Sequence, residues 1–333
     1  MKSSKITKKR AVLVCAALGV LGLYFMNASW VVTVPAKVTI LSHRGVHQTY
    51  EREGLKRDTC TAERTQVSDH EFLENTIPSI AAAFRNGADI VEIDIHPTKD
   101  GRFAVYHDWT LECRTNGEGV TREQTLAYLK GLDIGYGYTA DGGKTFPLRG
   151  KGVGLIPSLS EVLDEFPEGR FLINFKSNDP TEGEKLAAFL EVRSEPVKDR
   201  IFVYGGEEPT KRALRLVRDL RGFTKASLKS CVINYIAMGW SGYVPEECRD
   251  TMVVLPANYT MYLWGWPNRF IRRMNQNDSQ VFVAGDHHHQ ADVTGGIDDL
   301  RSLEALRPVR GFGIWTNRVE LVGPALKAKK KVN

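Results

Sequence analysis

Short apolar runs rich in β-branched and aromatic residues alternate with helical stretches along most of this chain. Such alternation is typical of parallel strands joined by crossover helices. Strands are expected at residues 38–42, 89–95, 102–107, 171–176, 201–204, 223–226, 252–256, 280–284 and 311–316. A closed α/β barrel has eight strands and takes roughly 250 residues. The length of 333 residues therefore allows one barrel, and one of the nine candidates, 223–226 or 252–256, is expected to be irregular.

Helices are expected between these strands, at residues 76–86, 158–166, 181–194, 211–220, 228–238, 267–275 and 298–306. Ser158 and Glu161 have the spacing of a capping box, and Thr181 precedes a first turn rich in glutamate. Two long polar stretches, 46–73 and 109–156, follow the first and third strands. Long loops within compact domains are usually functional. Both are expected to form the walls or the lid of a pocket, with a solvent-exposed loop as the alternative.

The first residues of the chain have a different character from the rest. Five basic residues precede residue 11, and residues 11–26 carry no charge. Low polar content extends the stretch to about the 20 residues that a helix needs to cross a bilayer. The pattern predicts a signal anchor, a transmembrane helix over residues 11–32, behind a basic cytoplasmic tail of residues 1–10. A cleaved signal peptide is the alternative. The barrel domain, residues 38–322, is then expected outside the cytoplasm, in the periplasm if the source is bacterial.

The formal net charge of +5 comes from the two ends of the chain. Nine of the 45 basic residues lie in residues 1–10 and in a basic C-terminal tail, residues 323–333, which leaves 36 basic against 40 acidic residues between them. A nucleic-acid groove needs basic residues clustered on the folded domain. We therefore expect no nucleic-acid partner.

Four of the five cysteines are candidates for disulfides, because Cys15 lies in the apolar N-terminal stretch. An even number of cysteines in an oxidising compartment is typical of disulfide bonding. Cys60 and Cys113 both lie in loops that follow strands, so these two residues could meet, which leaves Cys231 to pair with Cys248. Four cysteines allow three pairings, and four free thiols are the alternative.

Glu92 and Asp94 lie two residues apart on an expected strand, so their side chains point to the same face. The surrounding residues 89–95, DIVEIDI, predict a strand buried on both faces. Two ionised carboxylates at such a position repel each other unless a positive charge lies between them. A hard divalent cation, Mg²⁺ or Ca²⁺, is the expected partner of these oxygen ligands.

His43 and His107 each close an apolar run. The active site of an α/β barrel lies at the C-terminal ends of its strands, where both histidines are expected beside the carboxylates. Imidazoles titrate near neutral pH and suit proton transfer, and the forked guanidinium of Arg44 suits phosphate. This set predicts metal-assisted phosphodiester hydrolysis. The run at residues 287–289, HHH, is expected to form a polar surface loop rather than a metal site.

Several motifs occur in a fixed order around these residues. Residues 92–108, EIDIHPTKDGRFAVYHD, combine E-x-D, T-x-D-G and H-D. They follow HRG at 43–45 and ENT at 74–76, and LDIG comes after them at 132–135. This order resembles the glycerophosphodiester phosphodiesterase family over residues 38–320, most strongly in the first half.

The resemblance implies a TIM-like (β/α)8 barrel, in which the two long polar stretches of this sequence are loop insertions after strands 1 and 3. It also implies hydrolysis of glycerophosphodiesters to glycerol 3-phosphate and an alcohol. The site residues that it implies are His43 and His107 as acid and base and Glu92 and Asp94 as metal ligands.

One position departs from the family pattern, which commonly carries Glu-x-Lys on the fourth strand, with the glutamate as a third metal ligand. Asn174 stands at the glutamate position, and Lys176 keeps the lysine. An amide oxygen still coordinates Mg²⁺ or Ca²⁺. We therefore expect weaker binding of a divalent cation at Glu92, Asp94 and Asn174, with Arg44 and Lys176 binding the substrate phosphate.

The expected partner is a small-molecule phosphodiester or a lysophospholipid head group, with the membrane bound through the N-terminal helix. Two other functions fit the same residues. A lyase of the same fold would release a cyclic phosphate from a lysolipid, and a non-catalytic tethered barrel would bind a phosphodiester without turnover.

Overall fold

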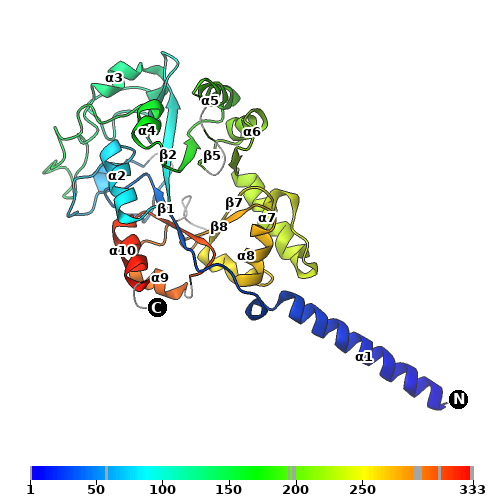
Figure 1. Ribbon diagram of the computed structural model, residues 1–333. Coiled ribbons are helices and arrows are strands. Elements are labelled where there is room, and N and C mark those ends of the chain that lie inside the picture. The colour runs from blue at the N-terminus through cyan, green and yellow to red at the C-terminus, as the bar shows by residue number, and fades with distance from the viewer. Residues whose placement is uncertain are drawn as a thin grey trace.

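Eight strands run parallel around a common centre, with helices outside them (Figure 1). The computed structural model describes residues 2–56, 59–193, 196, 200–287, 295–306 and 309–330. Within these ranges the barrel strands are β1 (Thr39–His43), β2 (Ile90–Pro97), β4 (Phe171–Phe175), β5 (Ile201–Gly205), β6 (Arg221–Gly222), β7 (Met252–Pro256), β8 (Gln280–Ala284) and β9 (Gly313–Thr316). Their order is β6-β5-β4-β2-β1-β9-β8-β7, and the Thr251 hydroxyl donates to the Gly222 carbonyl at 2.6 Å between the two ends. This nearly closed parallel barrel confirms the predicted α/β barrel.

The expected strand at 102–107 is not part of the barrel. β3 (Phe103–Val105) turns back from the end of β2 and pairs with it antiparallel, with Val105 opposite Ile95. Parallel strands need a crossover of a dozen or more residues, and residues 98–102 are too short for one. The strand outside the barrel is therefore 102–107. Of the two candidates expected to be irregular, 252–256 is the regular strand β7, whereas the strand near 223–226 is short. The two-residue β6 lies just before 223–226.

All seven expected helices are present in the described ranges and cover the outside of the barrel. They are α2 (Ile77–Asn86), α4 (Leu159–Glu165), α5 (Pro180–Val192), α6 (Glu207–Leu216), α7 (Lys225–Met238), α8 (Asn268–Asn275) and α9 (Leu300–Ala305). Ser158 and Glu161 make both hydrogen bonds of the predicted capping box. The sequence patterns do not predict α3 (Leu126–Lys130) or α10 (Val319–Lys330), and α10 continues through much of the expected C-terminal tail.

A layer of buried apolar side chains fills the barrel beneath the predicted site. It comprises Leu41, Ile90, Leu172, Phe202, Met252 and Phe282. Residues two apart on a strand face the same side. His43, Glu92, Asn174 and Tyr204 each lie two residues beyond a member of this layer. The strands that fill the core with apolar side chains therefore present polar ones at the barrel mouth.

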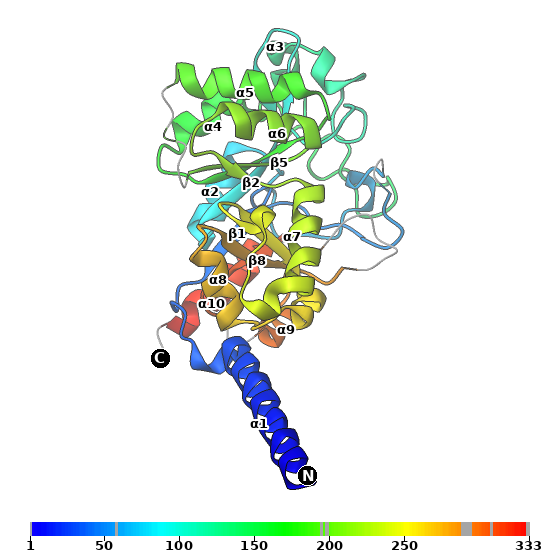
Figure 2. The same ribbon diagram turned by 90° about the vertical axis from the view of Figure 1, so that its right-hand side faces the viewer.

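The insertions at 46–73 and 109–156 pack against each other beside the barrel (Figure 2). The Cys60–Cys113 disulfide joins them, and the Thr139 N–H donates to the Ala62 carbonyl at 3.0 Å. A second disulfide, Cys231–Cys248, joins α7 to the turn before β7. Both disulfides are the expected pairs, so the alternative of four free thiols is wrong. The insertions share a buried apolar cluster that includes Leu111, which distinguishes them from solvent-exposed loops.

α1 (Lys2–Asn27) precedes the barrel and extends away from it in both views (Figures 1 and 2). The helix begins among the basic residues rather than at residue 11. It ends at Asn27, before a separate 3-10 turn over Ser29–Val31. No helix in the part of the chain that the structure describes has the length and apolar character needed to cross a bilayer. The expected transmembrane helix over residues 11–32 is therefore not supported.

Candidate active site

His43 ends β1, and Arg44 follows in a left-handed conformation with a φ of 57°. This conformation costs a non-glycine residue about 1–2 kcal/mol, and hydrogen bonds hold it in place. The Arg44 N–H donates to the Glu92 backbone oxygen at 3.0 Å, and the Ser79 hydroxyl donates to the Arg44 carbonyl at 3.1 Å. The next residue, Gly45, leaves room for Ser79, because a Cβ there would lie 2.2 Å from Ser79 Oγ. Hydrogen bonds to the N–H and to the carbonyl of Arg44 thus hold the turn on both sides of this residue.

Asp94 is buried on β2 and is the centre of a cluster of donors. Its Oδ1 accepts from the Asn174 amide at 2.8 Å and lies 3.3 Å from Lys176 Nζ. Its Oδ2 accepts from the Asn75 amide at 2.9 Å and lies 3.2 Å from Arg44 Nε. Burial favours the protonated acid, but the charges of Lys176 and then Arg44 outweigh it and hold the pKa of Asp94 well below its usual range. Asp94 is therefore an ionised carboxylate that gathers two of the predicted phosphate-binding cations.

Glu92, two residues earlier on the same face, is also buried, but the nearby positive charges offset the cost of ionising it less than they do for Asp94. Its Oε1 accepts from the Tyr204 hydroxyl at 2.7 Å, and its Oε2 accepts from the Arg44 N–H at 3.1 Å and lies 3.7 Å from His43 Nε2. Burial, followed by the negative charge of Asp94, raises the pKa of Glu92 to about 8. Glu92 thus holds a proton at neutral pH unless another positive charge takes its place.

Asn174 donates its amide to Asp94 instead of offering its oxygen to the mouth. The Asn174 Oδ1 points toward Gly205, where a Cβ would lie only 2.3 Å away. Coordination of a cation through Oδ1 requires the amide to turn over. The glycine at 205, with a φ of 109°, leaves space beside this side chain.

His43 is oriented by a residue from the far end of the chain. Its Nδ1 lies 2.6 Å from the Oδ1 of Asn317, the residue that directly follows β9. The Asn317 amide nitrogen donates to Asp298 Oδ2 at 2.7 Å, and this bond fixes which end of Asn317 faces His43. His43 must therefore carry its proton on Nδ1, because Asn317 offers it only an acceptor. The Nε2 lone pair of His43 is left for the barrel mouth.

His107 reaches the same mouth through the β3 hairpin. The Tyr106 N–H donates to the Asp94 backbone oxygen at 3.0 Å, so the chain returns to the carboxyl end of β2. The Nδ1 of His107 lies 2.6 Å from Asp108 Oδ1, which places its proton on Nδ1 as well. Although 102–107 is not a barrel strand, the hairpin brings His107 close enough to Arg44, Lys176 and Asp94 for their charges to act on its imidazole.

Both histidines are uncharged at neutral pH. Burial, followed by the positive charge of Arg44, holds the pKa of His43 well below its ordinary value. The same two causes, in the same order, lower the pKa of His107. Asp94 acts on both imidazoles in the opposite direction. The two rings therefore lie in the field of the same arginine and the same carboxylate.

Several polar residues of this mouth have no role assigned from the sequence: Glu74, Asn75, Asp108, Tyr204 and Asn317. The first three belong to the motifs at 74–76 and 92–108, and these motifs are the signal that could have assigned them. Glu74 pairs with Arg44 Nη1 at 3.2 Å. Tyr204 and Asn317 carry a weaker signal, since each lies two residues beyond an inward-facing aromatic residue, Phe202 or Trp315.

The groups available to a cation are two carboxylates and one amide. Among the described residues, no three or more His, Cys, Asp or Glu side chains are arranged to hold a metal ion. Glu92 is nevertheless a buried carboxylate whose proton a cation could replace. Oxygen donors suit hard divalent cations. Glu92 and Asp94, with Asn174 turned over, are therefore the residues that could hold a hard divalent cation, with one charge fewer than three carboxylates would supply.

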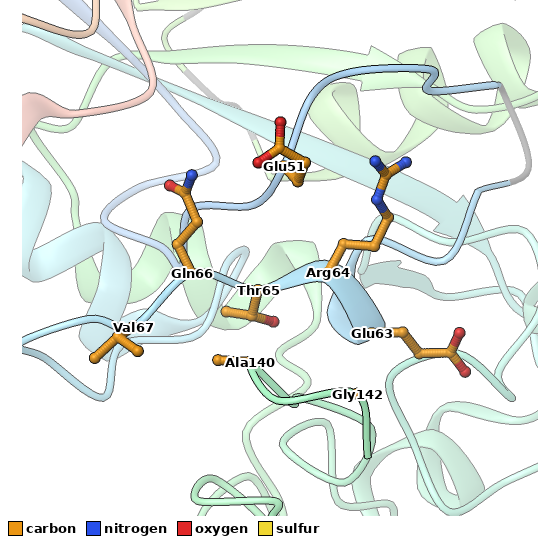
Figure 3. A pocket seen from close by; sticks show the side chains of 8 residues that line it. All are labelled: Glu51, Glu63, Arg64, Thr65, Gln66, Val67, Ala140 and Gly142. Atoms are coloured by element: carbon orange, nitrogen blue, oxygen red, sulfur yellow. The ribbon is translucent and has the colours of Figure 1, made fainter. Parts of the chain in front are cut away.

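A separate hollow lies between the two insertions (Figure 3). It is lined by Glu51, residues 63–67, Ala140 and Gly142. None of the predicted site residues lines it, so this hollow is not the barrel mouth. His288 and His289 of the HHH run lie outside the described residues.

Residues 43–201 match the model of the "Glycerophosphoryl diester phosphodiesterase family". Over these residues, fewer than half of the chain, the sequence is similar to this family. Among its curated relatives, a glycerophosphodiester phosphodiesterase of Bacillus subtilis is 40% identical over 124 residues, which are 35% of this chain and 41% of that protein. A second, from Caldanaerobacter subterraneus, is 39% identical over 103 residues, which are 31% of this chain and 39% of that protein. The chain thus spans about two fifths of the length of these two relatives.

Solved structures of the family are similar over most of the chain. The glycerophosphoryl diester phosphodiesterase domain of a Mycobacterium tuberculosis protein aligns with a TM-score of 0.61 at 15% identity, covering 87% of this chain and 99% of that one. A phosphodiesterase of Oleispira antarctica, in complex with the product sn-glycerol-3-phosphate, gives a TM-score of 0.53 at 18% identity, covering 88% and 97%. At such identities the likeness shows the fold, and it extends beyond residue 201 into the second half of the barrel.

Proposed function

We propose that this chain hydrolyses glycerophosphodiesters to glycerol 3-phosphate and an alcohol. The observation that carries the proposal is the pair of imidazoles at the barrel mouth. Asn317 and Asp108 each accept the Nδ1 proton of one ring, so proton transfer at His43 and at His107 falls to Nε2. The match of residues 43–201 to the family model supports the same reaction.

The phosphate of the substrate is bound by Arg44 and Lys176. Both cations lie within 3.3 Å of Asp94, so they are already directed to one point of the mouth. A guanidinium and an ammonium at this point offset the negative charge that develops on the phosphoryl oxygens during the reaction. Glu74 holds Arg44 from the other side.

The two histidines move the protons. One Nε2 accepts a proton from the nucleophile, and the other donates a proton to the leaving alcohol oxygen. The nucleophile is either water, which gives glycerol 3-phosphate directly, or a substrate hydroxyl, whose cyclic phosphate a water molecule then opens to glycerol 3-phosphate. The acid must first be protonated. The negative charge of a bound phosphodiester raises the pKa of a nearby imidazole and so counteracts the lowering by Arg44 and burial.

Glu92, Asp94 and Asn174 would hold a divalent cation, Mg²⁺ or Ca²⁺. Such a cation, when bound, polarises a phosphoryl oxygen and lowers the pKa of a nucleophile. Asn174 makes this site less negative than a three-carboxylate site, and we expect correspondingly weaker binding.

Phosphorus NMR of the purified protein with glycerophosphocholine, Mg²⁺ and Ca²⁺ tests the proposal. We expect a glycerol 3-phosphate signal to grow, and His43→Ala and His107→Ala to lower its rate by roughly 10²–10⁴-fold. His70→Ala is the control, because His70 lies in an insertion and contacts Gln48. Full activity in either site variant would refute the assigned roles. Accumulation of a cyclic phosphate would identify a lyase, and binding without turnover would identify a non-catalytic barrel.

We further propose that the barrel works in an oxidising compartment outside the cytoplasm. The disulfides Cys60–Cys113 and Cys231–Cys248 support this location, because cytosolic thiols are kept reduced. Fusion of the chain to a reporter enzyme that is active only outside the cytoplasm tests it. An inactive but intact fusion would contradict the location.

A further inference from the structure

Arg114 is a buried arginine in the second insertion, and the reaction described above does not use it. It is 3% exposed and joins four groups. Its Nη1 binds Asp108 Oδ2, and its Nη2 donates to Thr61 Oγ1 at 2.6 Å and lies 3.4 Å from Glu74 Oε1. Its Nε donates to the Tyr138 hydroxyl at 3.0 Å. One guanidinium thus connects both insertions to the carboxylate beside His107.

The charge of Arg114 determines the state of Asp108. Burial would favour the protonated acid, but Arg114, followed by the hydrogen bond from His107, holds the pKa of Asp108 below its ordinary value. An ionised Asp108 can only accept hydrogen bonds, so it keeps the His107 proton on Nδ1. If the guanidinium were removed, a buried Asp108 would gain a proton more readily and would no longer impose this tautomer.

The Cys60–Cys113 disulfide lies directly beside these contacts. Cys113 precedes Arg114 in the chain, and Cys60 precedes Thr61, which accepts from the Arg114 guanidinium. The bond therefore joins the two insertions at the residues next to this hydrogen bond. The backbone is also tightly packed here, since a Cβ at Gly137 would lie 1.9 Å from the Cys113 carbonyl oxygen.

We propose that Arg114 is a positioning residue for His107, acting through Asp108, and that the Cys60–Cys113 disulfide holds Arg114 in place. The disulfide then supports the rate of the reaction as well as the fold. This inference rests on the proposed function for its kinetic consequence, but the state of the His107 imidazole can be measured without substrate.

Two variants test the two links separately. Arg114→Met removes the charge and leaves the disulfide, and Cys60→Ser with Cys113→Ser removes the disulfide and leaves the arginine. The matched control is Cys231→Ser with Cys248→Ser, because that disulfide lies in a different apolar cluster with no predicted site residue in it. We expect kcat for glycerophosphocholine to fall about 10²-fold in Arg114→Met and about tenfold without Cys60–Cys113, with KM changed less than kcat. The control should keep the kcat of the unmodified protein.

Nitrogen-15 NMR of labelled histidines gives the second readout. In the unmodified protein and in the control, His107 should show one tautomer with its proton on Nδ1. Both test variants should show mixed tautomers of His107.

A single Nδ1–H tautomer and unchanged kcat in Arg114→Met would overturn the role of Arg114. The same result without Cys60–Cys113 would overturn the role of the disulfide. If that double variant fails to fold, Arg114→Met with its disulfide intact still decides the first link, and thiol reduction of the folded protein, followed by the same NMR measurement, decides the second. If the unmodified protein shows no hydrolysis, the proposed function fails while the tautomer comparison still decides this proposal.

Discussion

Each imidazole at the barrel mouth depends on one neighbouring oxygen for its tautomer. Asn317 accepts from His43 and Asp108 accepts from His107, and each acceptor is held in turn by a charged group, Asp298 or Arg114. The two acceptors differ in chemistry, since one is a neutral amide and the other an ionised carboxylate. A proton on the Nε2 of His43 is therefore opposed across the ring by a neutral amide oxygen, and a proton on the Nε2 of His107 by an ionised carboxylate.

Replacement of Asn317 by alanine should leave His43 free to change tautomer. We expect kcat to fall by about 10²-fold, at the lower end of the range for acid–base groups. The melting temperature should change less than in a core variant, since Asn317 lies beyond the end of β9. Asn86→Ala, which removes an amide that donates to the Ala82 carbonyl on α2, is the control. Equal kcat in the two variants would show that Asn317 does not orient His43.

The raised pKa of Glu92 predicts how stability depends on pH. Between its ordinary value of 4.5 and about 8, the folded protein binds a proton at Glu92 that the unfolded chain has lost. The free energy of unfolding should therefore fall across this window as the pH rises. A cation that binds the ionised carboxylate competes with this proton, so Mg²⁺ or Ca²⁺ should raise the melting temperature more at pH 8 than at pH 6.

Thermal denaturation of the metal-free and metal-loaded protein measures both effects. Glu92→Gln should remove the extra fall in stability and the difference in the metal response between the two pH values. Glu71→Gln replaces an exposed carboxylate in the first insertion and should keep both. A metal response in Glu92→Gln equal to that of the unmodified protein would place the cation elsewhere.

The boundaries of most barrel strands follow from the sequence to within about two residues, because buried parallel strands are continuous apolar runs. The direction of β3 does not follow from its apolar pattern, which suits either orientation. It follows instead from the length of residues 98–102, since this connection cannot hold a crossover helix. The partners of the site residues were harder to predict. Asn317, which Asp298 holds, meets His43 only after the barrel closes, and no local pattern encodes that contact.

The turn before β3 should control activity through the position of His107. Gly101 has a φ of 75°, and a Cβ there would meet no atom within 4 Å, so Gly101→Ala adds backbone strain without a clash. Gly54 in the first insertion has a φ of 67° and equally open surroundings. Both substitutions should lower the free energy of unfolding by about 1 kcal/mol. Only Gly101→Ala should lower kcat. An equal fall in kcat in both variants would show that the hairpin does not control activity through the position of His107.

The barrel as a whole gathers its mouth from segments far apart in the chain. His43 ends β1 and Arg44 follows it, the carboxylates lie on β2, Lys176 follows β4, and Asn317 follows β9. The family model ends at residue 201, so the residue that orients His43 lies outside the matched region. Closure of the barrel through β9 is therefore a requirement of the site and not only of stability.

The substrate phosphate is expected to lie between two imidazoles at the end of β2. A crystal structure of the protein with glycerol 3-phosphate and Ca²⁺ tests this position. We predict a phosphate within hydrogen-bonding distance of the Nε2 atoms of His43 and His107, with Arg44 and Lys176 on its oxygens. A phosphate bound away from both rings, or imidazoles too far apart to reach it together, would contradict the account.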